Sequence, residues 1–235
     1  MAHPAGMILR KKRTADDNKE QMTIKIRKEE IPGTVIEAKR WWRREIRRQI
    51  RETSEDYRRD AARRITEAVT SMDEYRQAET IFAYYSYRRE VNTAELIDRM
   101  LADGKRVCLP LCTDLGEDGK RVTDAPEMEA REIQGTAELI PGAYGIPEPG
   151  PETAVVKPEE VDMIILPCVT CDRECRRLGQ GGGYYDKFLD SVRADCAKIA
   201  VCYETALADK LPVEEHDMPV DAVVTEERIY RWRPE

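Results

Sequence analysis

Residues 177–189 have the sequence Arg-Leu-Gly-Gln-Gly-Gly-Gly-Tyr-Tyr-Asp-Lys-Phe-Leu, with four glycines in five positions. An apolar run, Val161–Pro167, precedes this stretch, and an amphipathic segment, Tyr184–Val192, includes its end and continues beyond it. The order strand, glycine loop, helix is typical of loops that hold phosphate, because glycine adopts positive φ and lets the backbone approach an anion closely. The following helix adds free N–H groups and the positive end of a dipole. These features favour an anion-binding loop.

A tight strand-to-helix turn is the plainer interpretation of the same glycines. One glycine is enough for such a turn, however, and three in a row carry an entropic cost. The spacing matches neither G-x-G-x-x-G nor the Walker motif. Arg177 stands at the loop entrance, where a guanidinium can hold phosphate oxygens through two donors. Asp186 falls in the first helical turn, within reach of a metal ion bound to such phosphates. We therefore favour an anion site.

Charge is distributed unevenly along the chain. Its 235 residues favour one domain, or one domain with an appendage, and suffice for a sizeable core. The formal net charge is −7, but residues 1–51 carry +8 and the remainder −15. A basic arm on an acidic body can contact nucleic acid or polyphosphate. More often it is a solvated tail plus a charged helix face, so nucleic acid is not an expected partner.

The sequence pattern contains no membrane or secretion signal. No apolar run approaches the length that crosses a bilayer, and the N-terminal residues lack an apolar signal core before their basic cluster. Seven cysteines, an odd number, fit a reducing compartment better than a disulfide framework. We expect a cytoplasmic, monomeric protein with no membrane partner.

Residues 1–33 are polar and charged, so we expect a flexible basic extension followed by a single α/β domain over residues 34–235. A helical pattern begins at Val35, and its apolar residues recur at spacings of four: Trp42, Ile46 and Ile50. Ser54 is typical of a helix start. The apolar face of the second helix consists of Tyr57, Ala61, Ile65 and Val69.

Strands and helices then alternate. Apolar runs predict strands at Ile81–Tyr85, Arg106–Leu111, Glu127–Ile133, Val161–Leu166, Lys198–Tyr203 and Asp221–Thr225. Thr93 can cap a helix over Ala94–Ala102 that ends at Gly104, and Asp118-Gly119 is typical of a turn. The proline-rich stretch Pro141–Pro158 is expected to be an irregular loop. This alternation predicts a three-layer α/β/α fold with a mostly parallel, Rossmann-like sheet and helices on both faces.

Other residues around the glycine loop are ambiguous when they are considered alone. Lys39 and Arg43 are four apart on a helix and project from one face, but an ordinary basic helix face explains them as well. Glu90 follows the first predicted strand, at the end where a crevice forms in such sheets. A surface glutamate is its plainer interpretation. Tyr84 and Tyr85 alternate along that strand, so some of its rings must be packing residues.

The glycine stretch resembles the signature of the 5-formyltetrahydrofolate cyclo-ligase family, also called 5,10-methenyltetrahydrofolate synthetase. The resemblance extends from about Lys39 to Thr225, and the glycine block is its specific part. Weaker matches follow in the family's order at residues 38–43 (Ala-Lys-Arg-Trp-Trp-Arg), 84–90 (Tyr-Tyr-Ser-Tyr-Arg-Arg-Glu), 144–149 (Tyr-Gly-Ile-Pro-Glu-Pro) and 212–221 (Pro-Val-Glu-Glu-His-Asp-Met-Pro-Val-Asp).

The resemblance implies an ATP- and magnesium-dependent ligase that converts 5-formyltetrahydrofolate to 5,10-methenyltetrahydrofolate, ADP and phosphate. The formyl oxygen would attack the γ-phosphate to give an iminium phosphate, and the N-10 amine would then close the ring. Such chemistry needs positioning and charge neutralisation, so no side-chain nucleophile is expected. The alternatives are a paralogue acting on another small molecule, or a non-catalytic nucleotide- or RNA-binding relative.

The resemblance also implies the site residues. The catalytic cations would be Lys39, Arg43 and Arg177. The ATP-binding set would be Lys39, Arg43, Arg177, Leu178, Gly179, Gln180, Gly181, Gly182, Gly183, Tyr184 and Tyr185. The folate would contact Tyr85, Glu90, Tyr144, Gln180, Gly181, Gly182, Gly183 and Tyr184, with the Glu90 carboxylate accepting hydrogen bonds from the pterin. Magnesium would be held by Asp186 and Asp217 together with phosphate oxygens. No phosphate contact is required of Arg40, Arg44, Arg47 and Arg48.

A cysteine cluster suggests a different chemistry. Cys168, Cys171 and Cys175 follow a predicted strand at spacings that occur in zinc sites and redox loops. The pattern lacks a second C-x-x-C to close a zinc site, so we favour small buried cysteines. A further departure from the family is Arg88-Arg89, where relatives often have smaller or polar residues. This pair could alter access to the pterin position.

Overall fold

The structure is a computed structural model that describes residues 33–116, 120–142, 145–214 and 217–234. The expected extension up to residue 32, the expected turn at Asp118-Gly119 and Tyr144 lie outside the described residues.

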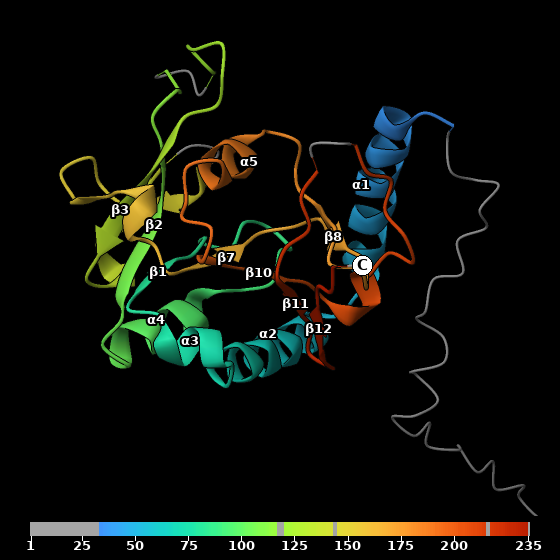
Figure 1. The fold of residues 1–235 in the computed structure, drawn as a ribbon, viewed down its shortest axis with the longest axis horizontal. Coiled ribbons are helices and arrows are strands. Elements are labelled where there is room, and N and C mark those ends of the chain that lie inside the picture. The colour runs from blue at the N-terminus through green and yellow to red at the C-terminus, as the bar shows by residue number, and fades with distance from the viewer. Residues whose placement is uncertain (1–32, 117–119, 143–144, 215–216, 235) are drawn as a thin grey trace, which may run out of the picture. The chain divides into compact units, whose positions relative to one another are not determined.

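A mixed, eight-stranded sheet forms the centre of the described part (Figure 1). In spatial order its strands are β12 (Ile229–Arg231), β11 (Ala222–Val224), β10 (Ala197–Val201), β7 (Met163–Leu166), β1 (Thr80–Phe82), β2 (Arg106–Cys112), β3 (Met128–Ile133) and β6 (Val155–Val156). The strands from β11 to β2 run parallel, whereas β12, β3 and β6 pair antiparallel at the two edges. Strands β1, β7 and β11 are buried along their whole length, as expected for parallel strands covered on both faces. The predicted α/β fold with a mostly parallel sheet is confirmed.

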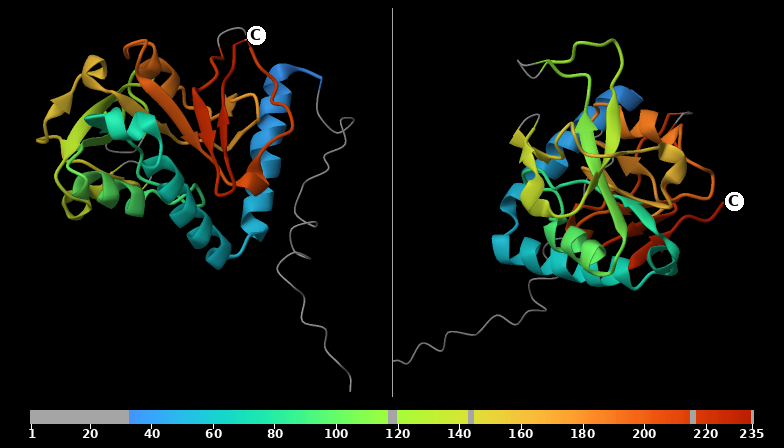
Figure 2. Two further views of the ribbon diagram at one scale, coloured as in Figure 1. Left: turned by 60° about the horizontal axis from the view of Figure 1, so that its bottom comes forward. Right: turned by 90° about the vertical axis from the view of Figure 1, so that its left-hand side faces the viewer.

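Helices cover both sides of this sheet. The described α-helices are α1 (Val35–Glu52), α2 (Glu55–Thr70), α3 (Asp73–Gln77), α4 (Ala94–Ala102) and α5 (Tyr184–Leu189). Figures 1 and 2 show α2, α3 and α4 along one side of the sheet and α5 on the other. None of the helices in the described part combines the length and the apolar character that a bilayer crossing requires.

The first two helices begin and pack as the sequence predicts. Thr34 caps α1 by accepting the N–H of Glu37 at 3.3 Å, and Ser54 caps α2 by accepting the N–H of Tyr57 at 3.1 Å. On α1, Trp42 and Ile46 are buried; on α2 the buried set includes Ala61, Ile65 and Val69. The spacing of four therefore marks the core-facing side of both helices.

The first predicted strand ends earlier than expected. Strand β1 stops at Phe82, and the chain leaves the sheet before Tyr84. Two local hydrogen bonds explain this: the Tyr84 hydroxyl donates to the carbonyl of Val91 at 2.9 Å, and the Thr93 hydroxyl donates to the carbonyl of Tyr84 at 2.6 Å. Thr93 is the N-cap residue of α4, as predicted, but its hydroxyl is engaged with Tyr84 and makes no capping hydrogen bond. The side chain of Asn92 accepts the Ala94 N–H instead, at 2.9 Å.

Several short elements have no counterpart in the sequence-based prediction. The proline-rich stretch, expected to be irregular, contributes the pair β4 (Ile140–Pro141) and β5 (Pro147–Glu148), the edge strand β6, and the 3₁₀ turn Pro158–Glu160. Further 3₁₀ turns are Thr136–Glu138 and Glu204–Ala206. Strand β12 was also not predicted.

A small hairpin separates β7 from the glycine loop. It consists of β8 (Thr170–Cys171) and β9 (Arg177–Leu178), so the loop does not follow the apolar strand directly. The turn of this hairpin is built on Asp172, which is fully buried and accepts the N–H groups of Glu174 and Arg176 at 3.0 Å each. Such a side-chain-centred turn has no signal as plain as glycine or proline.

Replacing Ile46 by alanine should lower the free energy of unfolding by about 2–5 kcal/mol, because the substitution leaves a cavity under α1 where Ile46 is fully buried. Ile36 lies on the same helix but is 57% exposed, so Ile36→Ala should change the free energy by less than about 0.5 kcal/mol. Urea denaturation followed by circular dichroism measures both. Equal effects would contradict the placement of Ile46 in the core.

Candidate active site

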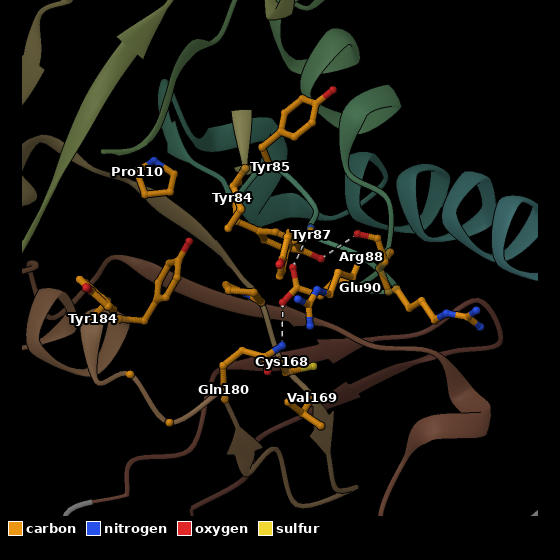
Figure 3. Close-up of a pocket in the computed structure, with 18 of the residues that line it drawn as sticks. Tyr84, Tyr85, Tyr87, Arg88, Glu90, Pro110, Cys168, Val169, Gln180 and Tyr184 are labelled. Atoms are coloured by element: carbon orange, nitrogen blue, oxygen red, sulfur yellow. Dashed lines mark hydrogen bonds between the residues drawn. The ribbon is translucent and has the colours of Figure 1, made fainter. Parts of the chain in front are cut away.

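A cavity of about 1000 Å³ opens at the carboxyl ends of the parallel strands. Its lining includes residues 84–85 and 87–91 after β1, residues 167–169 after β7, and residues 201–203 at the end of β10. Residues of α1 and of the glycine loop (residues 179–183) complete this part of the lining. Figure 3 shows part of this lining. Ligands of open α/β sheets bind at this edge, because the loops that follow parallel strands meet there.

The glycine loop depends on backbone conformations that other residues rarely adopt. Gly181 has φ 95° and Gly183 has φ 80°, where a Cβ would be strained. A Cβ on Gly181 would also lie 3.3 Å from the guanidinium of Arg43. Helix α5 begins directly after the loop but ends at Leu189 rather than Val192, so it is only six residues long. Neighbouring cations are therefore more important for an anion here than the dipole of α5.

Helix α1 supplies two of those cations. The Nε of Arg43 donates to the carbonyl of Gly179 at 2.8 Å, and the Nη2 of Arg47 donates to the Oε1 of Gln180 at 2.5 Å. Sequence reasoning named Arg43 but excluded Arg47 from the necessary contacts. The repeat of four that joins Lys39 and Arg43 continues to Arg47, and this repeat is the signal that would have found it.

The predicted metal ligands Asp186 and Asp217 both stabilise the charged form of the Arg43 guanidinium. Burial lowers the pKa of Arg43, and the charges of Asp186 and Asp217 oppose that shift. The Oδ2 of Asp217 accepts from the Nζ of Lys39 at 2.5 Å and from the N–H of Glu214 at 2.7 Å. Lys39 also pairs with the Glu214 carboxylate at 2.6 Å. Burial disfavours the charged form of Lys39, but its bonds to Asp217 and Glu214 outweigh burial and raise its pKa.

Arg177 forms an ion pair with Asp186. The sequence predicts that Arg177 binds phosphate and that Asp186 binds the metal ion. The Nη2 of Arg177 lies 2.5 Å from the Oδ1 of Asp186, and its Nη1 donates to the carbonyl of Pro167 at 3.2 Å. The Arg177 side chain is 9% exposed, whereas that of Asp186 is 73% exposed. Within the described residues the Oδ2 of Asp186 accepts no hydrogen bond. This oxygen therefore stays accessible to a ligand.

Glu90 is the acidic counterpart of the cationic loop. Its Oε2 accepts the backbone N–H of Tyr87 at 3.0 Å, and its Oε1 accepts from the Nε2 of Gln180 at 3.0 Å (Figure 3). Burial raises the pKa of Glu90, while these two hydrogen bonds and the charge of Arg47 act in the opposite sense. Gln180 thus links α1, the glycine loop and the stretch after β1 through a single side chain.

The remaining predicted residues have mixed environments. Tyr85 is half-buried and lines the cavity. The Tyr185 ring stacks on Phe82 at 6.0 Å, and its buried hydroxyl has no hydrogen-bond partner among the described residues. The side chain of Leu178 is buried in the core rather than in the loop. Gly182 and Tyr184 line the cavity, and the Tyr184 hydroxyl lies 3.0 Å from each carboxylate oxygen of Asp114.

The cysteines of the rival motif are core residues. Cys168, Cys171 and Cys175 are buried, free thiols, and burial raises the pKa of Cys171 and Cys175. In the described parts of the chain no group of three or more His, Cys, Asp or Glu side chains is arranged to hold a metal ion. Protein groups alone therefore do not make a closed metal site there.

Known proteins match this chain over most of its length. A model of the 5-formyltetrahydrofolate cyclo-ligase family matches residues 35–226. The 5-formyltetrahydrofolate cyclo-ligase of Escherichia coli K12 is 31% identical over 157 residues, which are 66% of this chain and 82% of that protein. The mouse 5-formyltetrahydrofolate cyclo-ligase is 29% identical over 203 residues, 83% of this chain and 96% of that protein.

A solved structure agrees with these sequence matches. The 5,10-methenyltetrahydrofolate synthetase of Aquifex aeolicus, determined by NMR, superposes with a TM-score of 0.70 at 31% identity, covering 84% of this chain and 94% of that one. The fold, the glycine loop and the relatives lead to the same conclusion: this chain belongs to the 5-formyltetrahydrofolate cyclo-ligase family.

Proposed function

We propose that this chain converts 5-formyltetrahydrofolate to 5,10-methenyltetrahydrofolate, consuming ATP and releasing ADP and phosphate. The observation that carries the proposal is the contact of Gln180 with both Arg47 and Glu90. It joins a cationic half of the cavity, suited to a triphosphate, to a partly buried carboxylate, Glu90, suited to a pterin. Two substrates bound in these halves would meet beside one side chain.

The triphosphate belongs on the glycine loop. Arg43, Arg47 and Arg121 donate to residues of the loop, Arg177 stands at its entrance, and Lys39 lies one helical turn before Arg43 on α1. In the structure Lys39 and Arg177 pair with Asp217 and Asp186. Phosphate oxygens accept from the same donors, so ATP would share or replace these carboxylates as partners.

The pterin belongs beside Glu90. An ionised carboxylate accepts two parallel hydrogen bonds, which matches the amino group and adjacent ring N–H of a pterin. Tyr85 lines the cavity near this position. The hydroxyl of Tyr185, which has no partner in the described ranges of the chain, offers a further polar contact. A buried hydroxyl without a partner is costly, so a ligand that bonds to it gains affinity.

Magnesium fits the carboxylates of this site, with Asp186 as its clearest ligand. Magnesium keeps several waters and takes one or two carboxylates beside substrate phosphates. Asp186 offers an exposed oxygen, and Asp217 acts on the same arginine from another segment. The bound ion would neutralise charge on the phosphates.

The reaction then needs no covalent help from the protein. The formyl oxygen attacks the γ-phosphorus, and the bond from that phosphorus to ADP breaks. The N-10 lone pair adds to the activated formyl carbon, N-10 loses its proton, and the carbon–oxygen bond breaks to release phosphate. The arginines and Lys39 stabilise charge on the transferring group, and Glu90 holds the pterin in line.

Two further properties are proposed on physical grounds. All seven cysteines are free thiols, which suits a reducing cytoplasm. Helix α1, the glycine loop and the segments after β1, β7 and β10 together form the cavity, and a monomer is the simplest active form we propose.

The direct test mixes the protein with 5-formyltetrahydrofolate and MgATP, with a chelator as control, and follows methenyl absorbance and ADP together. Product should require both ATP and metal. Asp186→Ala should lower kcat/KM about 100-fold, since it removes a charge-positioning group at the phosphates. Asp190→Ala, an exposed aspartate at the end of α5, should leave it unchanged. ADP without methenyl product would indicate another acceptor. The absence of both ADP and methenyl product, from a folded protein, would contradict the enzymatic function.

Gly181→Ala should raise the KM for ATP about 10-fold, because its φ of 95° strains an L-residue by about 1–2 kcal/mol and the new Cβ crowds Arg43. Gly135→Ala is the control: its backbone is extended, and a Cβ there meets no atom within 4 Å. Steady-state kinetics at saturating folate measures both. If Gly181→Ala keeps the normal KM, the loop does not hold the triphosphate.

The KM for 5-formyltetrahydrofolate should rise as the pH falls toward the pKa of Glu90. Burial raises this pKa above the ordinary value of 4.5, so protonation, which removes an acceptor oxygen, begins at a higher pH than for an exposed glutamate. Kinetics between about pH 5 and 8 measures the profile. Glu90→Gln should have a higher KM throughout and lack this pH dependence; the same profile in both proteins would refute the assignment.

A further inference from the structure

The fully buried carboxylate of Asp114 has no part in the proposed binding of ATP, folate or magnesium. Asp114 belongs to the arm that extends β2 and β3, called here the β2–β3 arm (residues 113–116 and 120–127). Its side chain is completely buried. The Tyr184 hydroxyl lies 3.0 Å from both of its oxygens, and its Oδ2 lies 3.0 Å from the Nε of Arg121. A buried charge is tolerated only with such partners, so the three side chains depend on one another.

Arg121 also reaches the glycine loop. Its Nη2 donates to the carbonyl of Gly182 at 3.1 Å, and its guanidinium lies 5.2 Å from the centre of the Tyr184 ring. Both Arg121 and Gly182 line the cavity. Next to them, a Cβ on Gly183 would lie 3.4 Å from Pro126 of the arm. The arm therefore contacts Gly182 directly and leaves little room for a side chain at Gly183.

Backbone hydrogen bonds join the two sides of the arm next to Asp114 and Arg121. The N–H of Val122 donates to the carbonyl of Asp114 at 2.7 Å, and that of Thr113 donates to the carbonyl of Glu127 at 3.1 Å. Leu115 and Arg121 form an antiparallel bridge. Figure 1 shows the arm rising from β2 and β3 on the side of the sheet that carries α5. This ribbon presents Asp114 and Arg121 together to the start of α5.

We propose that Arg121 is a positioning residue for the phosphate site. Together with Asp114 and Tyr184 it forms a latch that docks the β2–β3 arm on the glycine loop and holds the Gly182 peptide in the conformation that takes the triphosphate. The proposal rests on the ATP site assigned above and adds a specific device to it. Asp114 contributes through Arg121 and Tyr184, because it is buried away from the cavity-lining surface.

The latch makes a prediction that a direct phosphate contact does not. Arg121→Gln leaves the Asp114 charge with one hydroxyl, and Asp114→Asn leaves Arg121 without its carboxylate. Either change releases the arm, so each should raise the ATP KM about 10-fold and leave the folate KM within about 2-fold. The double variant removes both charges and should be no worse than the larger single effect, since coupled residues are not additive.

Steady-state kinetics for both substrates, calorimetric titration with MgATP and thermal denaturation test the latch in the full chain. Arg121→Lys keeps the charge but loses the planar donor fork; it should raise the ATP KM several-fold and provides the test if Arg121→Gln does not fold. Arg76→Gln is the control: this exposed arginine of α3 pairs with Asp73 and is not among the cavity-lining residues.

The outcomes separate the latch from its rivals. A raised ATP KM in Arg121→Gln with a normal value in Asp114→Asn would make Arg121 a direct ligand contact and overturn the positioning role. A normal ATP KM in folded Arg121→Gln, or equal rises for both substrates, would also overturn it. A wild-type chain that binds no MgATP in the titration would remove the ATP site itself. If the wild-type chain binds MgATP but forms no methenyl product, the proposed reaction is overturned and the ATP site is not.

Discussion

The parallel register of four central strands is the constraint on which the site depends. Phe82 of β1 pairs with Ile164 of β7, Leu166 of β7 pairs with Ala200 of β10, and Val201 of β10 pairs with Val224 of β11. Because these parallel strands all end at one edge of the sheet, the chain segments that follow them emerge at that edge. The stretch that carries Glu90, the hairpin before the glycine loop and the start of the turn after β10 therefore meet around one cavity, although they are far apart in sequence.

Opposite charges are concentrated at this edge and balanced in pairs. Helix α1 brings a row of cations to the loop of an otherwise acidic protein, and mutual repulsion adds to burial in lowering the pKa of Arg43. Carboxylates on two other segments, Asp186 and Asp217, offset it. A polyanion that enters such a site exchanges one set of charge pairs for another. This exchange confers selectivity for a particular charge pattern more than raw affinity.

Local patterns predicted the elements, whereas contacts between distant residues decided the site. The spacing of four located the core faces of α1 and α2, since burial follows the helical repeat. The repeat of four on α1 indicates Arg47, but no local pattern indicates that its partner is Gln180, which lies 133 positions away. The glycine block identified the loop, but a lone aspartate such as Asp114 carries no signal until the fold buries it. The early end of β1 likewise depends on the hydroxyls of Tyr84 and Thr93.

Those two hydroxyls also have a thermodynamic consequence for recognition. They tie the stretch from Tyr84 to Thr93 to itself, through bonds that span seven and nine positions. The conformational entropy of this stretch is thus lost when the chain folds, not when a ligand arrives. Rigid, pre-formed contact residues spare an incoming molecule the cost of ordering them. Glu90 lies within the stretch that these two hydrogen bonds close, so it would accept its ligand as a preorganised group. The entropic cost of ordering Glu90 lowers the free energy of unfolding and not the affinity for the ligand.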